Sequence, residues 1–217
     1  FLKIIILIIL LCSGIIGQTH PLTQRYFHKT DMGFDYQRGT YLIILADTSL
    51  ESIIRDEEYG NFITFKQTQG YNVDIRDMNS IGNSSDNLRG YLQYYYEQEP
   101  AGSMLEYVLL IGDVNGNFPI PSGSIESYNE DEMDVTDYPY TIYDDDKTNP
   151  LFFIGRWSIR SFDDLKKISL RTVQYVKMDS LQNSSYLNNA LIVAGNYSDS
   201  GTWPITPVWT SKWLMDE

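Results

Sequence analysis

Short apolar runs separated by turn residues recur along the chain after residue 38. Runs of about four to eight residues rich in Ile, Val and Leu are typical of strands buried on both faces of a parallel sheet. The pattern predicts strands at 40–47 (TYLIILAD), 71–78 (YNVDIRDM), 106–111 (EYVLLI), 151–157 (LFFIGRW) and 189–195 (NALIVAG).

Segments with helical spacing of apolar residues alternate with these strands. The pattern predicts helices at 49–69, 84–99 and 161–178, and the start of another within 205–217. Gly70 is placed to stop the first helix, and the third presents Leu165, Ile168, Thr172 and Val176 along one face. Residues 115–149, rich in Gly, Pro, Asp and Tyr, look like a loop. The alternation predicts an α/β fold: a mainly parallel sheet with helices on both faces.

The first 17 residues have a different pattern, in which Lys3 precedes an apolar run that ends near Ser13 and Gly14. This layout is typical of a secretory signal peptide, with cleavage expected at Gly17–Gln18. The alternative is a membrane anchor, but the apolar run is shorter than the roughly 18–20 residues that a span needs. We therefore expect a secreted, extracellular or cell-surface protein without stable membrane insertion. Residues 18–37 form a polar lead-in before the domain at 38–217.

Composition limits the kinds of partner. With 217 residues, of which 42% are hydrophobic and 14% aromatic, the chain can bury a core. Its formal net charge of −13 argues against nucleic acid or an anionic membrane as partner, because no basic stripe is present. Such acidity suits a solvated extracellular surface or divalent cations.

Cysteine and histidine are confined to the beginning of the chain. Cys12 lies inside the first apolar run, and His20 and His28 lie in the lead-in. Residues 39–217 therefore contain no Cys–His or Ser–His pair for nucleophilic catalysis. They also lack a G-x-S-x-G elbow and the glycine-rich phosphate-binding motifs.

Carboxylates are the remaining candidates for chemistry. Asp47, in Asp-Thr-Ser, is similar to the Asp-Thr-Gly of aspartic proteases, but it precedes a helix and is better interpreted as an N-cap. Asp113 follows the strand at 106–111, at the sheet edge where ligands usually gather. Together with Asp144 and Asp146 of the acidic loop it could supply oxygens to Ca²⁺. The alternative interpretation of that loop is a solvated acidic turn.

Five motifs in order resemble the catalytic domain of gingipain-type cysteine peptidases, peptidase family C25. They cover about residues 38–217. The motifs are Gly112-Asp113 before an Ile-Pro loop, Asp137 with Tyr140, Asp144–Asp146, Gly155-Arg156-Trp157-Ser158, and the helix at 161–178.

The resemblance implies a caspase-like α/β fold that is incomplete at the carboxyl end, a secreted endopeptidase acting on proteins, and structural calcium at Asp113, Asp144 and Asp146. It also implies a catalytic His and Cys beyond residue 217, so that this chain alone would be inactive. Asp199 is the candidate for the acid that orients the His. Residues 201–207 (GTWPITP) lack the carboxylate with which the best-known members hold a basic side chain, so the resemblance does not extend to Arg or Lys specificity.

Two other kinds of function remain open on the sequence. A non-catalytic secreted α/β module for binding or adhesion would keep the fold without the Cys–His pair. A carboxylate-based hydrolase would use Asp47, Asp113 or Asp137 as acid and base. The sequence after residue 217 separates the first alternative from a peptidase, and an acid–base pH profile would identify the second.

Overall fold

The computed structural model describes residues 38–98, 104–126, 133–143, 149–177 and 213–215. The chain divides into two units, Phe1–Val176 and Lys177–Glu217. In the described part of the second unit, residues 213–215 are helical. The predicted strand at 189–195, like the signal peptide and the lead-in, lies outside the described residues.

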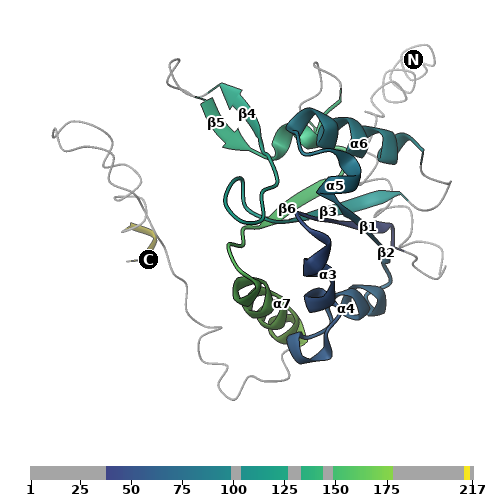
Figure 1. The fold of residues 1–217 in the computed structure, drawn as a ribbon, viewed down its shortest axis with the longest axis vertical. Helices are drawn as coiled ribbons and strands as arrows, with labels where there is room; N and C mark the ends of the chain where they lie inside the picture. Colours follow the sequence, from purple (N-terminus) through teal and green to yellow (C-terminus); the bar gives the residue numbers. More distant parts are fainter. Residues whose placement is uncertain (1–37, 99–103, 127–132, 144–148, 178–212, 216–217) are drawn as a thin grey trace, which may run out of the picture. The chain divides into compact units, whose positions relative to one another are not determined.

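Four parallel strands form the centre of the first unit (Figure 1). They are β1 (Thr40–Leu45), β2 (Asn72–Asp77), β3 (Leu105–Ile111) and β6 (Phe153–Trp157), in the spatial order β2-β1-β3-β6. Leu45 lies opposite Asp77 and Ile111, and Ile111 lies opposite Trp157, so the four carboxyl ends finish level with one another. The predicted parallel sheet is confirmed.

The core lies on the two central strands. Leu42, Ile43, Ile44 and Leu45 of β1 are all buried, as are Val108 to Ile111 of β3. A side chain of this size contributes about 1.5–3 kcal/mol when it is fully buried. Successive side chains of a strand point to opposite faces, so burial of consecutive residues requires cover on both faces.

Helices supply that cover, as Figure 1 shows. One face carries α3 (Glu51–Ile54), α4 (Phe62–Thr68) and α7 (Phe162–Lys177), and the other carries α5 (Met78–Ile81) and α6 (Ser85–Glu97). Ser84 caps α6 by accepting a hydrogen bond from the Asn87 N–H. Among the described residues, no helix is both long and apolar enough to cross a membrane.

The single helix predicted at 49–69 is wrong, because the segment breaks between α3 and α4. Asp56 caps the 3₁₀ turn Glu57–Tyr59, and Gly60 follows with a positive φ of 90°. The break lets α7 approach closely: Ser169 Oγ donates to the Tyr59 carbonyl at 2.9 Å, and a Cβ on Gly60 would meet Val173 at 3.1 Å. Gly70, the predicted stop of this segment, does follow the end of α4 with a positive φ.

The buried face of α7 also differs from its prediction. Val176 is 51% exposed, whereas Leu165, Ser169 and Val173 are buried. Residues 174–177 form an exposed last turn. Ser169 takes a core position because its hydroxyl is satisfied by the Tyr59 carbonyl, a partner that helical spacing alone does not reveal.

The segment expected to be loop contains a β-hairpin. Strands β4 (Gly123–Glu126) and β5 (Met133–Thr136) pair antiparallel, separately from the parallel sheet (Figure 1). We call these two strands the arm. The 3₁₀ turn Tyr138–Thr141 follows, with Tyr140 buried. The prediction of loop throughout 115–149 is therefore wrong: strands of four residues with mixed polarity are too short to stand out in the pattern.

Candidate functional site

Aspartates gather at the carboxyl edge of the sheet. Asp47 follows β1, Asp77 ends β2 and Asp113 follows β3. This edge is where ligands bind in open α/β sheets. The contacts of each carboxylate decide whether it is available for chemistry.

Asp47 and Asp77 cap the segments that follow them. Asp47 accepts from the Ser49 N–H at 2.8 Å, and hydrogen bonds from Ser49 lower the pKa of the Asp47 carboxyl. Asp77 accepts from the Ser80 N–H at 3.2 Å. The N-cap interpretation of Asp47 is confirmed, and both carboxylates have local structural roles.

Asp113 closes the loop that follows β3. Its backbone N–H donates to the Phe118 carbonyl at 2.9 Å, and its carbonyl accepts from the Ile120 N–H at 2.7 Å. Its carboxylate accepts from the Val114 N–H at 2.9 Å and lies 3.5 Å from Arg160 Nε. Asp113 therefore ends the strand and faces a cation beyond the end of β6.

Gly112 explains why this loop can fold back tightly. A Cβ at this position would lie 2.7 Å from the Phe118 carbonyl oxygen and 3.0 Å from Cβ of Ala46. Contacts this short leave room only for hydrogen, so glycine lets the loop pack against the end of β1. The Gly-Asp pair is thus a structural corner at the carboxyl edge.

Arg156 of β6 joins the sheet to the arm. Its Nε and Nη2 donate to the two carboxylate oxygens of Asp137 at 2.9 and 2.7 Å. Its guanidinium also donates to the carbonyl oxygens of Gly112, Ile120 and Pro121. The side chains of Arg156 and Asp137 are only 10% and 18% exposed. We call these five residues the clasp.

The clasp holds both ends of the arm. Pro121 precedes β4 and Asp137 follows β5, so one guanidinium binds the chain on either side of the hairpin. Ser122 Oγ adds a third link by donating to Asp137 at 2.9 Å. Sequence analysis gave Arg156 only as a motif landmark, and Asp137 as a landmark and as a candidate acid or base of a carboxylate-based hydrolase. The available signal was a lone arginine inside an apolar strand, a residue that is rarely buried without a partner.

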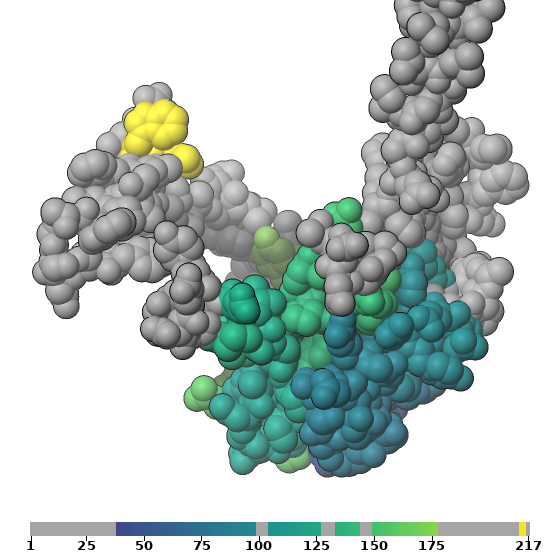
Figure 2. Space-filling model, turned by 90° about the horizontal axis from the view of Figure 1, so that it is seen from above, coloured from purple at the N-terminus to yellow at the C-terminus, as the bar shows by residue number. Residues whose placement is uncertain are grey.

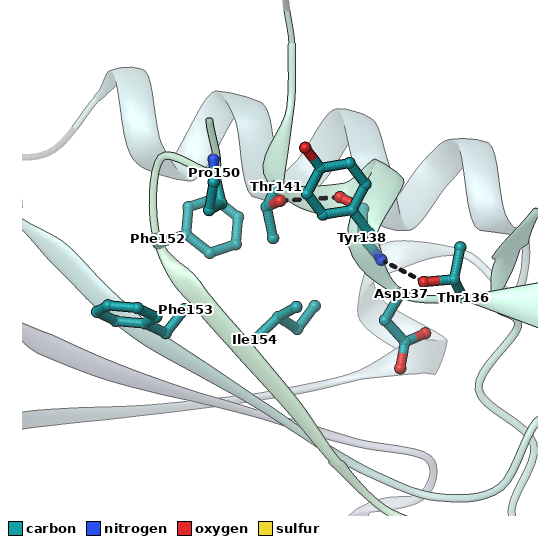
Figure 3. Close-up of a pocket in the computed structure, with 8 residues that line it drawn as sticks. All are labelled: Thr136, Asp137, Tyr138, Thr141, Pro150, Phe152, Phe153 and Ile154. Carbon is teal, nitrogen blue, oxygen red and sulfur yellow. Dashed lines mark hydrogen bonds between the residues drawn. The ribbon is translucent and has the colours of Figure 1, made fainter. Parts of the chain in front are cut away.

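Two hollows flank the base of the arm. A cavity of about 330 Å³ lies between the residues that follow β5 and the start of β6; it is drawn in Figure 3. Its lining is mainly apolar and includes Tyr138, Pro150, Phe152 and Ile154. A second cavity of about 220 Å³ lies on the β4 side, where Ser122 and Ser124 face Ser85 and Arg89 of α6.

The amino edge of the sheet holds a different cluster. The buried Glu106 carboxylate accepts from the Gly39 N–H at 2.9 Å, and Arg38 donates to the Tyr71 hydroxyl. Burial and the nearby Glu106 raise the pKa of Tyr71 to about 12. Sequence analysis missed this cluster. Its contacts tie the residues before β1 to β3 and to the start of β2, which is a structural role.

Of the predicted calcium ligands, only Asp113 lies in the described part of the chain. Asp144 and Asp146, like Asp199, lie outside it. Within the described ranges, no three or more His, Cys, Asp or Glu side chains form a group that could hold a metal ion. The calcium site and the orienting acid therefore stay predictions. The described carboxyl edge offers carboxylates and guanidiniums, but its residues include no thiol and no imidazole.

Comparison with known proteins identifies the family of this chain. The model of peptidase family C25 matches residues 35–214. Gingipain R1 of Porphyromonas gingivalis is 27% identical over 171 residues, which are 76% of this chain and 15% of that protein. Gingipain R2 of Porphyromonas gingivalis strain W83 is 26% identical over 152 residues, which are 67% of this chain and 19% of that protein.

A solved structure, the complex of the Porphyromonas gingivalis RgpB pro- and mature domains, matches with a TM-score of 0.50 and 25% identity. The match covers 62% of this chain and 29% of that one. The chain spans less than a quarter of the length of the curated gingipain sequences that it matches. Because the family model covers most of the sequence and the fold agrees, this chain belongs to peptidase family C25, the gingipain-type cysteine peptidases.

Proposed function

We propose that this chain is the amino-terminal part of a secreted gingipain-like cysteine endopeptidase that hydrolyses proteins. The family match over residues 35–214 carries the proposal. In this proposal, which follows the family resemblance, the catalytic Cys and His lie beyond residue 217. The only Cys and both His of this chain occur before residue 29. The chain itself is then a structural part of the enzyme.

The chemistry follows from the proposed dyad. A thiolate attacks the scissile carbonyl, an imidazole moves the proton, and backbone N–H groups stabilise the oxyanion. The described ranges of this chain supply neither a thiol nor an imidazole. Their proposed contribution is rigidity: the clasp and the closed loop after Asp113 hold the carboxyl edge in one arrangement. Asp199 stays the candidate for the acid that orients the imidazole.

Calcium is a separate proposal. The described residues do not by themselves form a site that fits the ion, because Asp113 is the one predicted ligand among them and its carboxylate faces Arg160. A site would need Asp144 and Asp146 as well. Thermal unfolding of the chain in CaCl₂ and in EGTA tests it: at 100 times the Kd, calcium would add about 2.7 kcal/mol to the free energy of unfolding. An unchanged midpoint contradicts the proposal.

The main experiment compares two polypeptides. The 217-residue chain with Cys12→Ser contains no thiol, so we expect neither hydrolysis of a mixed peptide library nor labelling by a thiol-reactive peptide probe. The longer product of the same reading frame should hydrolyse peptides and lose activity when its Cys is labelled. Turnover by the thiol-free chain contradicts the proposal.

Secretion is tested separately by mass spectrometry of the exported protein. We expect a chain that starts at Gln18, after removal of residues 1–17. An exported chain that keeps its apolar run contradicts the signal-peptide prediction.

A non-catalytic binding or adhesion module is the second candidate. The absence of thiol and imidazole from residues 38–217 favours it. A Gly-His-Gly motif and a Cys at a later strand end would decide for the peptidase, and a reading frame without them would decide for the module.

A further inference from the structure

The arm exposes large apolar side chains on a small element. Met133 is 57% exposed and Val135 is 66% exposed, and the register places both on the same face of β5. Ile125 of β4 is also exposed, but it lies opposite Asp134 and therefore on the other face of the arm. Grouped exposed apolar residues on a soluble protein mark interaction sites. Figure 2 shows the teal and green atoms of this part of the chain at the surface.

The strand edges of the arm are open within the described residues. There β5 pairs with β4 alone, so its other edge presents backbone N–H and C=O groups without a strand partner. Proteins often protect such an edge with Lys or Pro, and neither residue occurs in β4 or β5, whose charged residues are Glu126 and Asp134. A two-stranded hairpin is marginally stable, and a third strand would stabilise it.

The open edge leads into the 330 Å³ cavity. Thr136 ends β5 and lines this cavity, together with Tyr138 and Phe153, which are both partly exposed (Figure 3). In Figure 3 the Phe152, Phe153 and Ile154 side chains approach it from the start of β6. A segment extended along β5 would therefore find a place for an apolar side chain beyond the end of the strand.

The negative charge of this part of the chain indicates which kind of polypeptide segment would bind. Residues 122–146 contain nine Asp or Glu and no Lys or Arg. Glu126 and Asp134 are exposed acids that form no ion pair within the described part of the arm, while Asp137 is paired with Arg156. With a net charge of −13, a second copy of the chain would be repelled, and a basic segment attracted.

We propose that the arm binds an extended polypeptide segment in which basic and apolar residues alternate. The segment adds to the open edge of β5 as a third strand, with its basic side chains on the face of Asp134, its apolar side chains on the face of Met133 and Val135, and one apolar side chain in the cavity. Glu126 of β4 adds to the negative charge of the arm. Main-chain hydrogen bonds supply affinity in this mode of recognition, and the side-chain contacts supply specificity. The binding does not depend on peptidase activity.

The test uses the complete 217-residue chain and two fluorescent peptides, Lys-Val-Lys-Val-Lys-Val-Lys and its Glu-Val counterpart. Fluorescence anisotropy should detect binding of the basic peptide that weakens as salt is added, and at least about tenfold weaker binding of the acidic one. Hydrogen exchange should slow at the β5 amides when the basic peptide is bound.

Matched double variants locate the site. Glu126→Gln with Asp134→Asn should weaken binding at least about fivefold, whereas Glu58→Gln with Asp163→Asn removes two exposed carboxylates elsewhere and should leave it unchanged. Equal losses in the two variants, or equal binding of both peptides, would overturn the proposal. Concentration-dependent dimerisation that Val135→Lys abolishes would assign the arm to a second copy, and would overturn it too.

Discussion

The parallel sheet and the arm both contain apolar side chains, but these side chains are buried in the sheet and exposed on the arm. In β1 and β3 the Ile, Leu and Val side chains are buried and covered by helices on both faces. In β4 and β5 the Ile, Met and Val side chains are exposed, so no helix in the described part of the chain covers them. The sheet is held by burial, whereas the arm is held at its two ends by the clasp.

The parallel sheet and the arm should therefore respond to different mutations. Removing apolar volume should unfold the sheet and leave the arm little affected. Removing one guanidinium should release the arm and also leave buried polar groups unpaired at the edge of the sheet. Single substitutions in each region separate these two effects.

Arg156→Ala should be the most damaging single change. It removes the guanidinium that binds the Asp137 carboxylate and three carbonyl groups, and breaking a largely buried ion pair costs about 3–5 kcal/mol. Urea unfolding measures the loss. Arg160→Gln is the control: its side chain is 85% exposed, and its contact with Asp113 should contribute at most about 1 kcal/mol. Similar losses of unfolding free energy in the two variants would contradict the stabilising role of the clasp.

Leu110→Ala and Val135→Ala compare the two sheets directly. Leu110 is fully buried in β3, so its truncation should lower the free energy of unfolding by about 2–5 kcal/mol. Val135 is exposed on the arm, and its truncation should change that free energy by no more than about 0.5 kcal/mol. A large loss for Val135→Ala would mean that the arm is packed against something in the folded protein.

Gly60→Ala tests how the sheet is covered. Gly60 has a φ of 90° and approaches Val173 of α7, so alanine should cost about 1–2 kcal/mol. Gly90 in α6 has nothing within 4 Å of an added Cβ, and there alanine should stabilise by about 0.5–1 kcal/mol. Thermal unfolding of both variants measures these changes in stability, which should have opposite signs. Destabilisation by Gly90→Ala would show that this face of α6 is not open.

Tyr140 gives a smaller, pH-dependent effect at the base of the arm. Burial, and then the nearby Asp137 carboxylate, raise the pKa of Tyr140 to about 12. Because the folded pKa lies above the unfolded value of about 10, this contribution to stability is complete below pH 10 and is lost towards pH 12.

Tyr140→Phe removes that dependence, together with the hydrogen bond from the hydroxyl to the Pro121 carbonyl. The variant should be less stable at neutral pH, by about 1 kcal/mol, and the difference should shrink between pH 10 and 12. Unfolding in urea at several pH values measures this. A difference that stays constant with pH would contradict the raised pKa.

The strands, α6 and α7 could be predicted because their patterns are long or strongly apolar. The break at Gly60 was missed because each half of 49–69 has acceptable helical spacing. Asp56 and Gly60 make the break, and α7 approaches there. The arm was missed because strands of four residues are too short for an alternation such as Met133-Asp134-Val135-Thr136 to stand out as a pattern.

The candidate site was predictable in part. Asp113 was placed at the carboxyl edge, but the geometry shows a loop-closing residue facing Arg160. The clasp was not predicted, because Arg156 and Asp137 are 19 positions apart and only the tertiary fold brings them together. A pairing across that distance has no local signature.

Local pattern was enough for the class of fold, the parallel sheet and the resemblance to peptidase family C25, because burial imposes a periodicity on neighbouring residues. Tertiary structure alone decided which carboxylates cap, which face a guanidinium, and which apolar side chains stay exposed. Those outcomes depend on residues far apart in the chain, and the energy of a hydrogen bond or ion pair depends on the water that the surrounding fold excludes.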